Sequence, residues 1–371
     1  MSIPLWLSLS GCHGHSDEIK IAVALPLTGD IASLGQGLKR AAVMAVEEAN
    51  VSGAIAQKIT LELFDDRSDP KEAVSVANRI VADRSFVGVI GHFNSGCSIP
   101  ASRIYAEAHL PMLSPASTNP ELTVQQLSPQ WKWPRNIFRV NTTDNVQGAF
   151  GADFLFKDLK IKRLAVIHDK TAYGQGIAEE VKKQFVADGG TVVAFEGLQT
   201  GERDFRALVT RVDGFKPEAL YFGGMFSEGG ILLRQARDEG FKGVFLCSEA
   251  NYDPVFIQTA GTGAEGAYVT FVGSPATLLP SAKVFVEKYK MRYPNDEIKS
   301  YDHYGFEDAS LFIEGIKNVG PDRDKLIAYF RTVKFSGLLG TTQFDEKGDT
   351  LNKTITIYRV ENGVFKPTQK K

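Results

Sequence analysis

Hydrophobic residues follow two alternating spacings along the first third of the chain. Short apolar runs predict four strands, at 19–27, 59–64, 86–91 and 112–114. Apolar residues recur at helical spacing in the intervals, over 33–50, over 70–83 and up to Ala108. Pro70 begins the second of these helices, where a first-turn proline costs no hydrogen bond. Strands that alternate with helices in this way predict βαβ units and a parallel sheet.

The same alternation starts again after a loop rich in proline and tryptophan at 127–136. The second set of predicted strands lies at 163–168, 191–195, 219–222 and 244–246. The helices between them are expected at 174–187, 204–212 and 228–238. Two βα series of similar length predict two doubly wound α/β lobes. Ligands bind such sheets beyond the carboxyl ends of their strands, so two facing lobes can line one cleft.

The pattern changes after Gly273. Helices are predicted at 282–293, 304–318 and 322–332, and a last strand at 354–359. No low-complexity stretch and no short repeat interrupts the chain.

Composition and charge exclude several classes of function. The 371 residues favour two to three domains, and 43% hydrophobic with 23% charged residues is ordinary for a globular protein. A formal net charge of −2 provides no basic field for nucleic acid. No apolar run approaches the roughly 18 residues that span a bilayer. The three cysteines, Cys12, Cys97 and Cys247, fit neither a disulfide scaffold nor a spaced set of metal ligands.

The sequence also lacks the motifs of catalysis. It has no G-x-S-x-G elbow and no glycine-rich phosphate loop. His92 and His168 each end a predicted strand, without a nucleophile nearby in sequence. We therefore expect a binding protein, not an enzyme, with no cofactor and no metal.

The N-terminal segment carries a separate signal. A short apolar stretch precedes Cys12, and Leu9-Ser10-Gly11-Cys12 resembles the lipobox of bacterial lipoproteins, in which the cysteine is lipidated. No Lys or Arg precedes the apolar stretch, and it is shorter than usual, which a start codon further upstream would explain. We predict that residues 1–18 form a lipoprotein signal and tether with lipidation at Cys12. The alternative is a disordered leader with a chance cysteine.

Short motifs spread over more than 300 residues resemble the leucine/isoleucine/valine-binding family of transporter receptors. The likeness runs from Ile19 to about Val360, in order and with similar spacing. The motifs are Asp65-Asp66 with Asp69-Pro70-Lys71, Ile90-Gly91-His92, Ser114-Pro115-Ala116-Ser117-Thr118-Asn119-Pro120-Glu121-Leu122-Thr123, His168-Asp169-Lys170 with Tyr173-Gly174-Gln175-Gly176, Gly223-Gly224, Leu233-Arg234-Gln235-Ala236-Arg237, and Phe344-Asp345-Glu346-Lys347-Gly348-Asp349.

The resemblance implies a type I periplasmic binding protein fold, with two Rossmann-like lobes joined by a three-strand hinge. Carried over, lobe 1 comprises 19–140 plus 274–345, and lobe 2 comprises 141–273 plus 346–371. The implied protein is the monomeric, extracytoplasmic receptor of an ABC transporter, in the periplasm or on the outer face of the cytoplasmic membrane. It would close its hinge around a free amino acid, aliphatic or branched-chain, and pass it to a permease in the membrane.

The family's binding positions map onto both lobes. Ser95, at a strand-to-helix junction, matches a donor to the ligand carboxylate, and helix-start amides suit an anion. In the loop that contains Ser117, Ala116 matches a carbonyl for the ligand ammonium and Thr118 a hydroxyl and N–H donor. The alternatives are a helix N-cap for Ser95 and a self-bonded polar turn for the loop.

Lobe 2 supplies the remaining polar candidates. Glu249 follows a predicted strand and matches the acid that pairs with the ligand ammonium. Tyr173 matches a tyrosine at the edge of the cleft, a donor to the carboxylate. Together the two lobes divide the opposite charges of a zwitterion between them, so that the ligand can bridge and close them. Without the resemblance, Glu249 would equally suit a solvated loop.

The predicted side-chain pocket departs from the family pattern. Leu34 and Met225 stand where aromatic residues are usual, and Phe226 and Tyr301 are the remaining candidate walls. The pocket stays apolar but changes shape, which favours an uncharged ligand side chain. Ser68 and Asn94 occupy the places of the family's lobe 1 disulfide, so Cys97 and Cys247 are expected as small buried residues.

Two further interpretations remain open. The same fold serves as a ligand-sensing receptor domain, which gene neighbours would distinguish from a transport protein. Other proteins of this fold bind amides or small organic or aromatic acids, and for such a ligand Glu249 would lose its partner.

Overall fold

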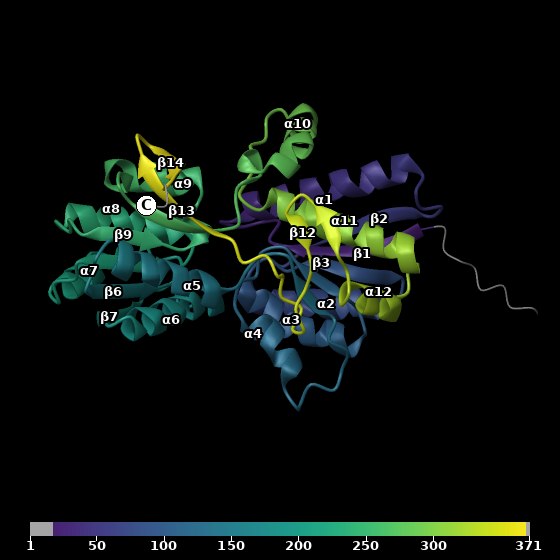
Figure 1. Ribbon diagram of the computed structural model, residues 1–371, viewed down its shortest axis with the longest axis horizontal. Coiled ribbons are helices and arrows are strands. Elements are labelled where there is room, and N and C mark those ends of the chain that lie inside the picture. The colour runs from purple at the N-terminus through teal and green to yellow at the C-terminus, as the bar shows by residue number, and fades with distance from the viewer. Residues whose placement is uncertain (1–17, 369–371) are drawn as a thin grey trace, which may run out of the picture.

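The computed structural model describes residues 18–368 and consists of two lobes side by side (Figure 1). Each lobe has one mainly parallel sheet covered by helices on both faces, which confirms the predicted pair of doubly wound α/β lobes. Cys12 and the predicted lipobox lie outside the described residues. Within the described part of the chain, no helix is both long and apolar enough to cross a membrane.

The first sheet is entirely parallel, in the order β2 (Lys58–Asp65), β1 (Glu18–Leu25), β3 (Phe86–Gly91), β4 (Met112–Ser114) and β5 (Ile137–Arg139). Its lobe also contains α1 (Ala32–Ser52), α2 (Pro70–Ala82), α3 (Ser95–Glu107), α4 (Glu121–Val124), α10 (Lys283–Arg292), α11 (Asp302–Val319), α12 (Arg323–Phe330) and the small hairpin of β11 (Phe335–Gly337) and β12 (Gly340–Thr342).

Strand β1 shows how the sequence fixes these layers. Ile21, Val23 and Leu25 pack with α1 and α11, whereas Ala22 and Ala24 pack with α2 and α3. A strand buried on both faces needs a continuous apolar run, which is the pattern at 19–25. The N-cap Asp69 accepts hydrogen bonds from the backbone N–H groups of Lys71 at 2.7 Å and Glu72 at 3.0 Å, which fixes the start of α2.

The second sheet has the order β14 (Val364–Pro367), β13 (Ile355–Glu361), β10 (Tyr268–Val272), β9 (Val244–Cys247), β8 (Ala219–Gly223), β6 (Arg163–His168) and β7 (Thr191–Gly197). Only β13 and β14 run antiparallel to their neighbours. Its helices are α5 (Asp144–Asp153), α6 (Ala172–Ala187), α7 (Arg206–Asp213), α8 (Phe226–Asp238) and α9 (Pro254–Ala260), with a 3-10 turn at Glu249–Asn251.

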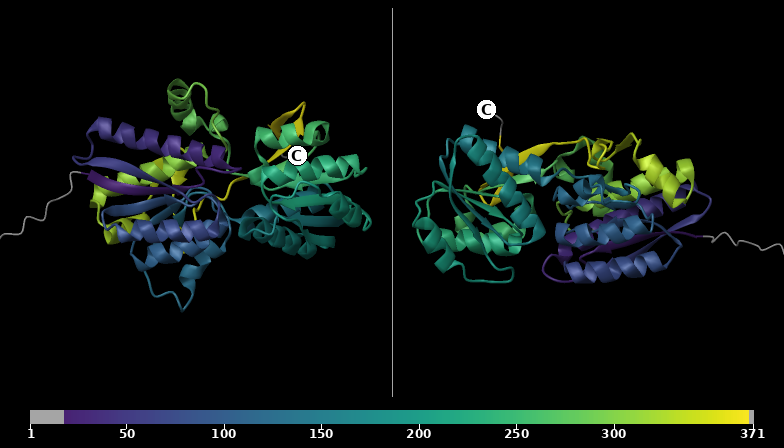
Figure 2. Two further views of the ribbon diagram at one scale, coloured as in Figure 1. Left: turned by 180° about the vertical axis from the view of Figure 1, so that it is seen from behind. Right: turned by 90° about the horizontal axis from the view of Figure 1, so that it is seen from below.

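The chain passes between the two sheets three times. It crosses between β5 and α5, again after β10, and finally between Asp349, which forms a β-bridge with Arg139, and β13. Residues 346–349, which the resemblance assigns to lobe 2, contact lobe 1 here. The views from behind and from below show the lobes as separate bodies joined by these narrow segments (Figure 2).

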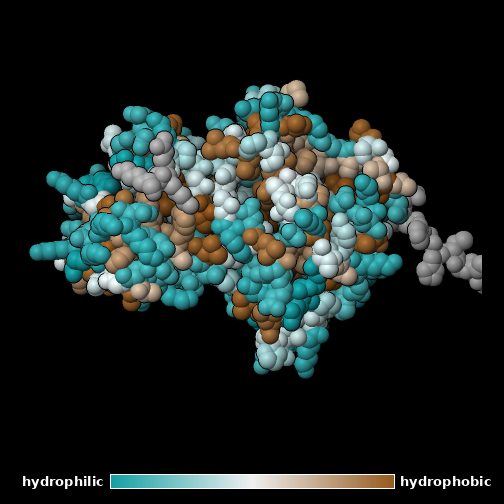
Figure 3. Space-filling model, in the orientation of Figure 1, coloured by the Kyte–Doolittle hydropathy of each residue, from teal (hydrophilic) through white to brown (hydrophobic). Residues whose placement is uncertain are grey.

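Most predicted elements are present within a few residues of their expected ends. The helices and strands that sequence reasoning missed are α4, β5, α5, α9, β10, β11, β12 and β14. Strand β5 has only three residues, and α5 contains Gly148 and Gly151, so neither has a clear apolar period. On the face drawn in Figure 3, exposed apolar residues are scattered among polar ones.

Candidate functional site

The polar candidates of lobe 1 lie where β3 and β4 end. Ser95 is the first residue of α3 and is buried, and its hydroxyl accepts a hydrogen bond from the backbone N–H of Asn119 at 3.2 Å. Thr118 is also buried, and its carbonyl accepts from the backbone N–H of Asp144, in lobe 2, at 2.9 Å. The carboxyl ends of two neighbouring strands thus hold both hydroxyls close to the second lobe.

The loop between β4 and α4 is held largely by its own polar groups. The Ser117 hydroxyl donates to the Phe93 carbonyl at 2.8 Å and lies 2.5 Å from the Ser98 hydroxyl. The Ala116 carbonyl accepts from the Asn141 side-chain amide at 2.9 Å. This carbonyl oxygen has a second lone pair, which leaves room for one more donor. The structure therefore shows Ser117 supporting the loop and Ala116 already engaged once.

A buried arginine that sequence reasoning missed clamps the same loop. Arg139, fully buried, donates to the carbonyls of Ser117 at 3.0 Å and Asn119 at 2.8 Å. Its Nε lies 2.6 Å from the Asp349 carboxylate, and Thr123 also bonds that carboxylate at 2.7 Å. Burial alone would raise the pKa of Asp349, but the Arg139 charge and these hydrogen bonds lower it below its usual value. The conformation of the loop thus depends on a charge pair beside the hinge.

Glu249 is the central polar residue of lobe 2. It begins the 3-10 turn after β9 and is buried, and its carboxylate accepts from the Gln147 side-chain amide at 2.6 Å. Burial raises its pKa, while the hydroxyl of Tyr173, the amide of Gln147 and the hydroxyl of Tyr301 act in the opposite direction. Tyr173 belongs to lobe 2, whereas Tyr301 precedes α11 in lobe 1. Polar side chains of both lobes therefore surround one carboxylate.

A second buried acid lies next to Glu249. Asp144, the first residue of α5, has a pKa well above its usual range because it is buried and because Glu249 is a nearby negative charge. The Thr118 hydroxyl and the Arg139 charge partly offset this effect. Burial also raises the pKa of Tyr173 well above its usual range, and the Glu249 charge adds to that rise. This junction between the lobes is consequently rich in carboxyl groups.

The apolar candidates belong to the main core that reaches both lobes. Leu34, Phe226 and Tyr301 are buried members of it, and Met225, the N-cap of α8, is partly buried against it. The Tyr301 ring lies 5.3 Å from that of Phe93 and 6.3 Å from that of Phe271, which lies in lobe 2. Tyr301 thus connects the polar group around Glu249 with the apolar wall.

Two further contacts join the lobes. The Ser300 hydroxyl donates to the Tyr252 carbonyl at 2.7 Å, and the Lys299 ammonium lies 3.4 Å from the Asp253 carboxylate. Lys299 and Ser300 precede α11 in lobe 1, whereas Tyr252 and Asp253 follow β9 in lobe 2. The segment just before Tyr301 therefore also contacts lobe 2.

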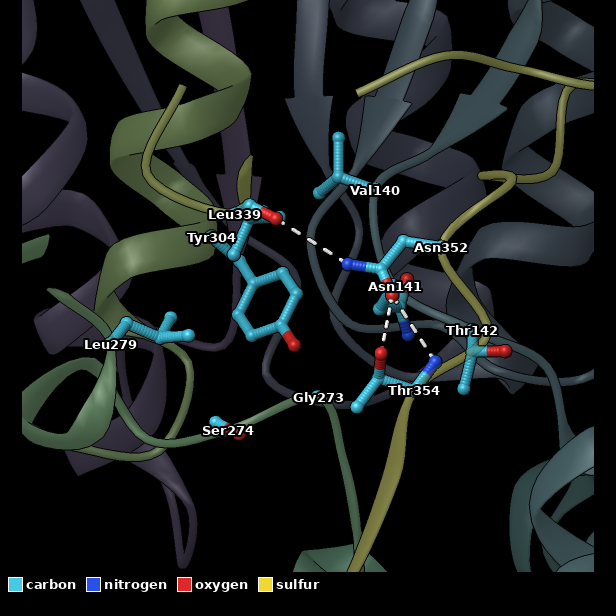
Figure 4. A pocket seen from close by; sticks show the side chains of 10 residues that line it. All are labelled: Val140, Asn141, Thr142, Gly273, Ser274, Leu279, Tyr304, Leu339, Asn352 and Thr354. Atoms are coloured by element: carbon cyan, nitrogen blue, oxygen red, sulfur yellow. Dashed lines mark hydrogen bonds between the residues drawn. The ribbon is translucent and has the colours of Figure 1, made fainter. Parts of the chain in front are cut away.

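The hinge contains a small pocket of about 60 Å³, separate from these candidates (Figure 4). All three crossings contribute, and Asn352 accepts from the Thr354 N–H at 3.1 Å and hydroxyl at 2.8 Å. Its lining residues are Val140, Asn141, Thr142, Gly273, Ser274, Leu279, Tyr304, Leu339, Asn352 and Thr354. None of the predicted site residues lines it, so this pocket belongs to the joint between the lobes.

Some chemically reactive side chains elsewhere are buried in the core. His92 lies 2.6 Å from the Asp66 carboxylate and 2.9 Å from the Tyr105 hydroxyl, all buried within lobe 1. Cys97 and Cys247 are buried free thiols, which confirms their predicted role as small core residues. Among residues 18–368, no group of three or more His, Cys, Asp or Glu side chains is arranged to hold a metal ion.

Sequence reasoning missed Arg139, Asn141, Asp144 and Gln147, which all lie at or just after the first crossing. The available signal was the spacing of Asp144 and Gln147, three residues apart and so on one face of a helix. Because no helix was predicted there, this spacing had no structural context.

The geometry defines a two-lobed binding protein whose polar groups meet between the lobes. Comparison with known proteins agrees: the family model described as "Periplasmic binding protein" matches residues 18–364. A Leu/Ile/Val-binding protein homolog 1 from Brucella suis biovar 1 is 35% identical over 93% of this chain and 91% of its own length. A leucine-, isoleucine-, valine-, threonine- and alanine-binding protein from Pseudomonas aeruginosa is 34% identical over 95% of this chain and 93% of its own.

Among solved structures, a leucine-binding protein from Thermotoga maritima MSB8 is similar with a TM-score of 0.85 and 30% identity, covering 95% of this chain and 98% of that one. The chain belongs to the periplasmic binding protein family. The predicted resemblance and the predicted fold are therefore confirmed, and the chain is a binding protein, not an enzyme.

Proposed function

We propose that this protein is the extracytoplasmic receptor of an ABC transporter and binds a free amino acid with an uncharged, aliphatic side chain between its lobes. The observation that carries the proposal is the Glu249 carboxylate. It is buried between the lobes, and no ion pair with it occurs anywhere in residues 18–368. A buried carboxylate is costly unless a cation compensates it, and the ammonium group of an amino acid is a suitable cation.

The opposite end of such a ligand requires hydrogen-bond donors. Ser95 at the start of α3, the Thr118 hydroxyl and the Tyr173 hydroxyl are the candidates. The Thr118 hydroxyl is buried beside the Asp144 carboxyl and the Tyr173 hydroxyl beside the Glu249 carboxyl, but within the described chain neither makes a hydrogen bond of regular geometry. Buried hydroxyls are normally paired, so both suit the carboxylate of a bound amino acid.

The apolar wall narrows the choice of ligand. Leu34, Met225, Phe226 and Tyr301 offer no charge to a ligand side chain. The Brucella and Pseudomonas relatives are named for leucine, isoleucine and valine, and the latter also for threonine and alanine. Short, uncharged side chains are common to all five amino acids, which supports an aliphatic ligand here.

Calorimetry on the full chain tests this proposal against its alternative. The panel should contain the twenty amino acids, acetamide and benzoate. We expect binding of leucine, isoleucine or valine, and a ligand at a hundred times its Kd adds about 2.7 kcal/mol to the free energy of unfolding. Binding of the amide or the aromatic acid, without binding of any amino acid, would contradict the proposal and favour a different ligand class.

The cellular role follows from the same proposal. We place the protein outside the cytoplasmic membrane, held by a lipid on Cys12 and docking as a monomer on a permease. Labelling with a palmitate analogue in a bacterial host should mark the wild-type chain and not the Cys12→Ala variant. Equal labelling of both chains would contradict lipid anchoring through Cys12, and it would not affect the proposal on ligand binding.

A further inference from the structure

We infer that Asn119 of lobe 1 and Gly176 of lobe 2 form a latch that sets how readily the lobes close. This inference rests on the proposed function, because it concerns the closed arrangement in which a ligand would be held. Neither residue belongs to the proposed ligand contacts. Both lie in short motifs, one beside Thr118 and the other three residues after Tyr173.

Asn119 is fixed to lobe 1 and bonded to lobe 2. Its side-chain oxygen accepts from the backbone N–H of Glu121 at 2.9 Å, within its own loop. Its side-chain nitrogen donates to the carbonyl of Ala172, the first residue of α6, at 2.6 Å. Because the second bond joins residues of different lobes, we infer that it is made in the closed arrangement and lost when these surfaces separate.

Gly176 provides the space that this contact requires. A Cβ atom at position 176 would lie 2.6 Å from the side-chain nitrogen of Asn119 and 3.6 Å from an oxygen of Asp144. The first distance is too short for any real contact. The Asn119 amide can give way only by breaking its bonds to Glu121 or Ala172. A side chain at position 176 therefore opposes closure.

Backbone conformation does not explain the glycine. Gly176 lies inside α6 and is absent from the positions with positive φ. Glycine is a poorer helix former than alanine in such a position. The local structure would be more stable with alanine, so the advantage of glycine lies in the contact with lobe 1.

The latch adjoins the proposed ligand site on both lobes. A built Cβ on Gly96, the neighbour of Ser95, would lie 3.8 Å from that of Ala172, so the starts of α3 and α6 meet here. A contact made only in the closed arrangement shifts the equilibrium toward it and so tightens ligand binding without touching the ligand.

The test compares Gly176→Ala with wild type by urea unfolding, by leucine calorimetry and by small-angle scattering of the full chain. We expect the variant to be as stable as wild type or more stable when free, because alanine favours the helix. We expect its affinity for leucine to fall roughly five- to tenfold, the value of about one hydrogen bond. At equal leucine concentration its radius of gyration should remain larger.

Gly151→Ala is the matched control, since it is another helical glycine of lobe 2 and its Cβ would find ordinary contacts at 3.4 and 3.5 Å. It should bind and close like wild type. A Gly176→Ala protein that also binds and closes like wild type would overturn the latch. If wild type itself binds no amino acid, the proposed function fails, and the latch is then judged on the free proteins alone, where Gly176→Ala must be the more open.

Asn119→Ala completes the test through a double-mutant cycle. Removing the amide loses the bond to Ala172 but also removes the obstruction. The double variant Asn119→Ala with Gly176→Ala should therefore bind leucine no more weakly than Asn119→Ala alone. Losses that add would show that the two residues act independently and would contradict the inference.

Discussion

The side-chain amide of Gln147 donates to the Glu249 carboxylate at 2.6 Å and to the Thr270 hydroxyl at 2.7 Å. Gln147 lies on α5, Thr270 on β10, and Glu249 follows β9, so three elements of lobe 2 fix one carboxylate. A charge held in place before the ligand arrives loses little freedom on binding. This arrangement is the basis of the first two predictions.

Glu249→Gln should weaken binding of leucine by about 2–5 kcal/mol, because it removes one partner of a desolvated charge pair. The substitution keeps the size of the side chain and removes only its charge. Calorimetry measures the loss, with Glu202→Gln on an exposed loop as the control of equal chemistry. An unchanged affinity would show that the ligand ammonium is held elsewhere.

Gln147→Leu should change the pH dependence of binding as well as its strength. The Gln147 hydrogen bond lowers the pKa of Glu249, so its removal raises that pKa further. Because an ammonium ligand needs the ionised carboxylate, binding should fail at a higher pH than in wild type as the solution is acidified. Affinity measured at several pH values gives both midpoints, and identical midpoints would contradict this role for Gln147.

Arg139→Met should destabilise the protein by about 3–5 kcal/mol, because it removes the buried partner of the Asp349 carboxylate and leaves that charge only the partly exposed Lys347 ammonium, 3.4 Å away. The exposed pair of Arg206 and Asp204, 3.1 Å apart, supplies the comparison. Arg206→Met should cost at most about 1 kcal/mol. Urea unfolding measures the stability of both variants. Equal losses of free energy of unfolding would mean that the buried pair stabilises the protein no more than the exposed pair.

We predict that the buried Glu307 makes the stability of the protein depend on pH, whether or not a ligand is bound. Burial raises its pKa from 4.5 to about 7, against hydrogen bonds from Thr342 and Leu338. A carboxyl group whose pKa is higher in the folded than in the unfolded protein contributes stability at pH values below its unfolded pKa. This contribution is lost as the pH rises through its folded pKa. The stability of wild type relative to Glu307→Gln should therefore fall by about 2–3 kcal/mol between pH 5 and pH 8. Urea unfolding measures this difference in the free energy of unfolding. A difference that stays constant between pH 5 and pH 8 would contradict the prediction.

The alternation of apolar runs was sufficient to predict both lobes. Strands such as β1 are buried on both faces, and their continuous apolar sequences are easily recognised. Strand β5 and helix α5 were missed because tertiary contacts, not local periodicity, define them. Arg139, for example, ends β5 and is held by Asp349, 210 residues further along the chain.

The sequence likewise identified some residues of the candidate site and missed others. Residues at strand ends, such as Ser95 and Glu249, were accessible through position and motif. Their supporting partners were not, because Gln147 reaches Glu249 from a helix that is 102 residues away in sequence. The sequence around Asn141 likewise did not indicate that the Asn141 side-chain amide donates to the Ala116 carbonyl.

Small-angle scattering of the full chain with and without saturating leucine tests the account most directly. The proposed site is divided, with Ser95, Ala116 and Thr118 on lobe 1 and Tyr173 and Glu249 on lobe 2. A zwitterion that needs both halves must favour the closed arrangement over the open one. We predict a smaller radius of gyration on adding leucine, and a Thr118→Ala variant that needs more leucine for the same change. Identical scattering curves with and without the ligand would contradict closure around a bound amino acid.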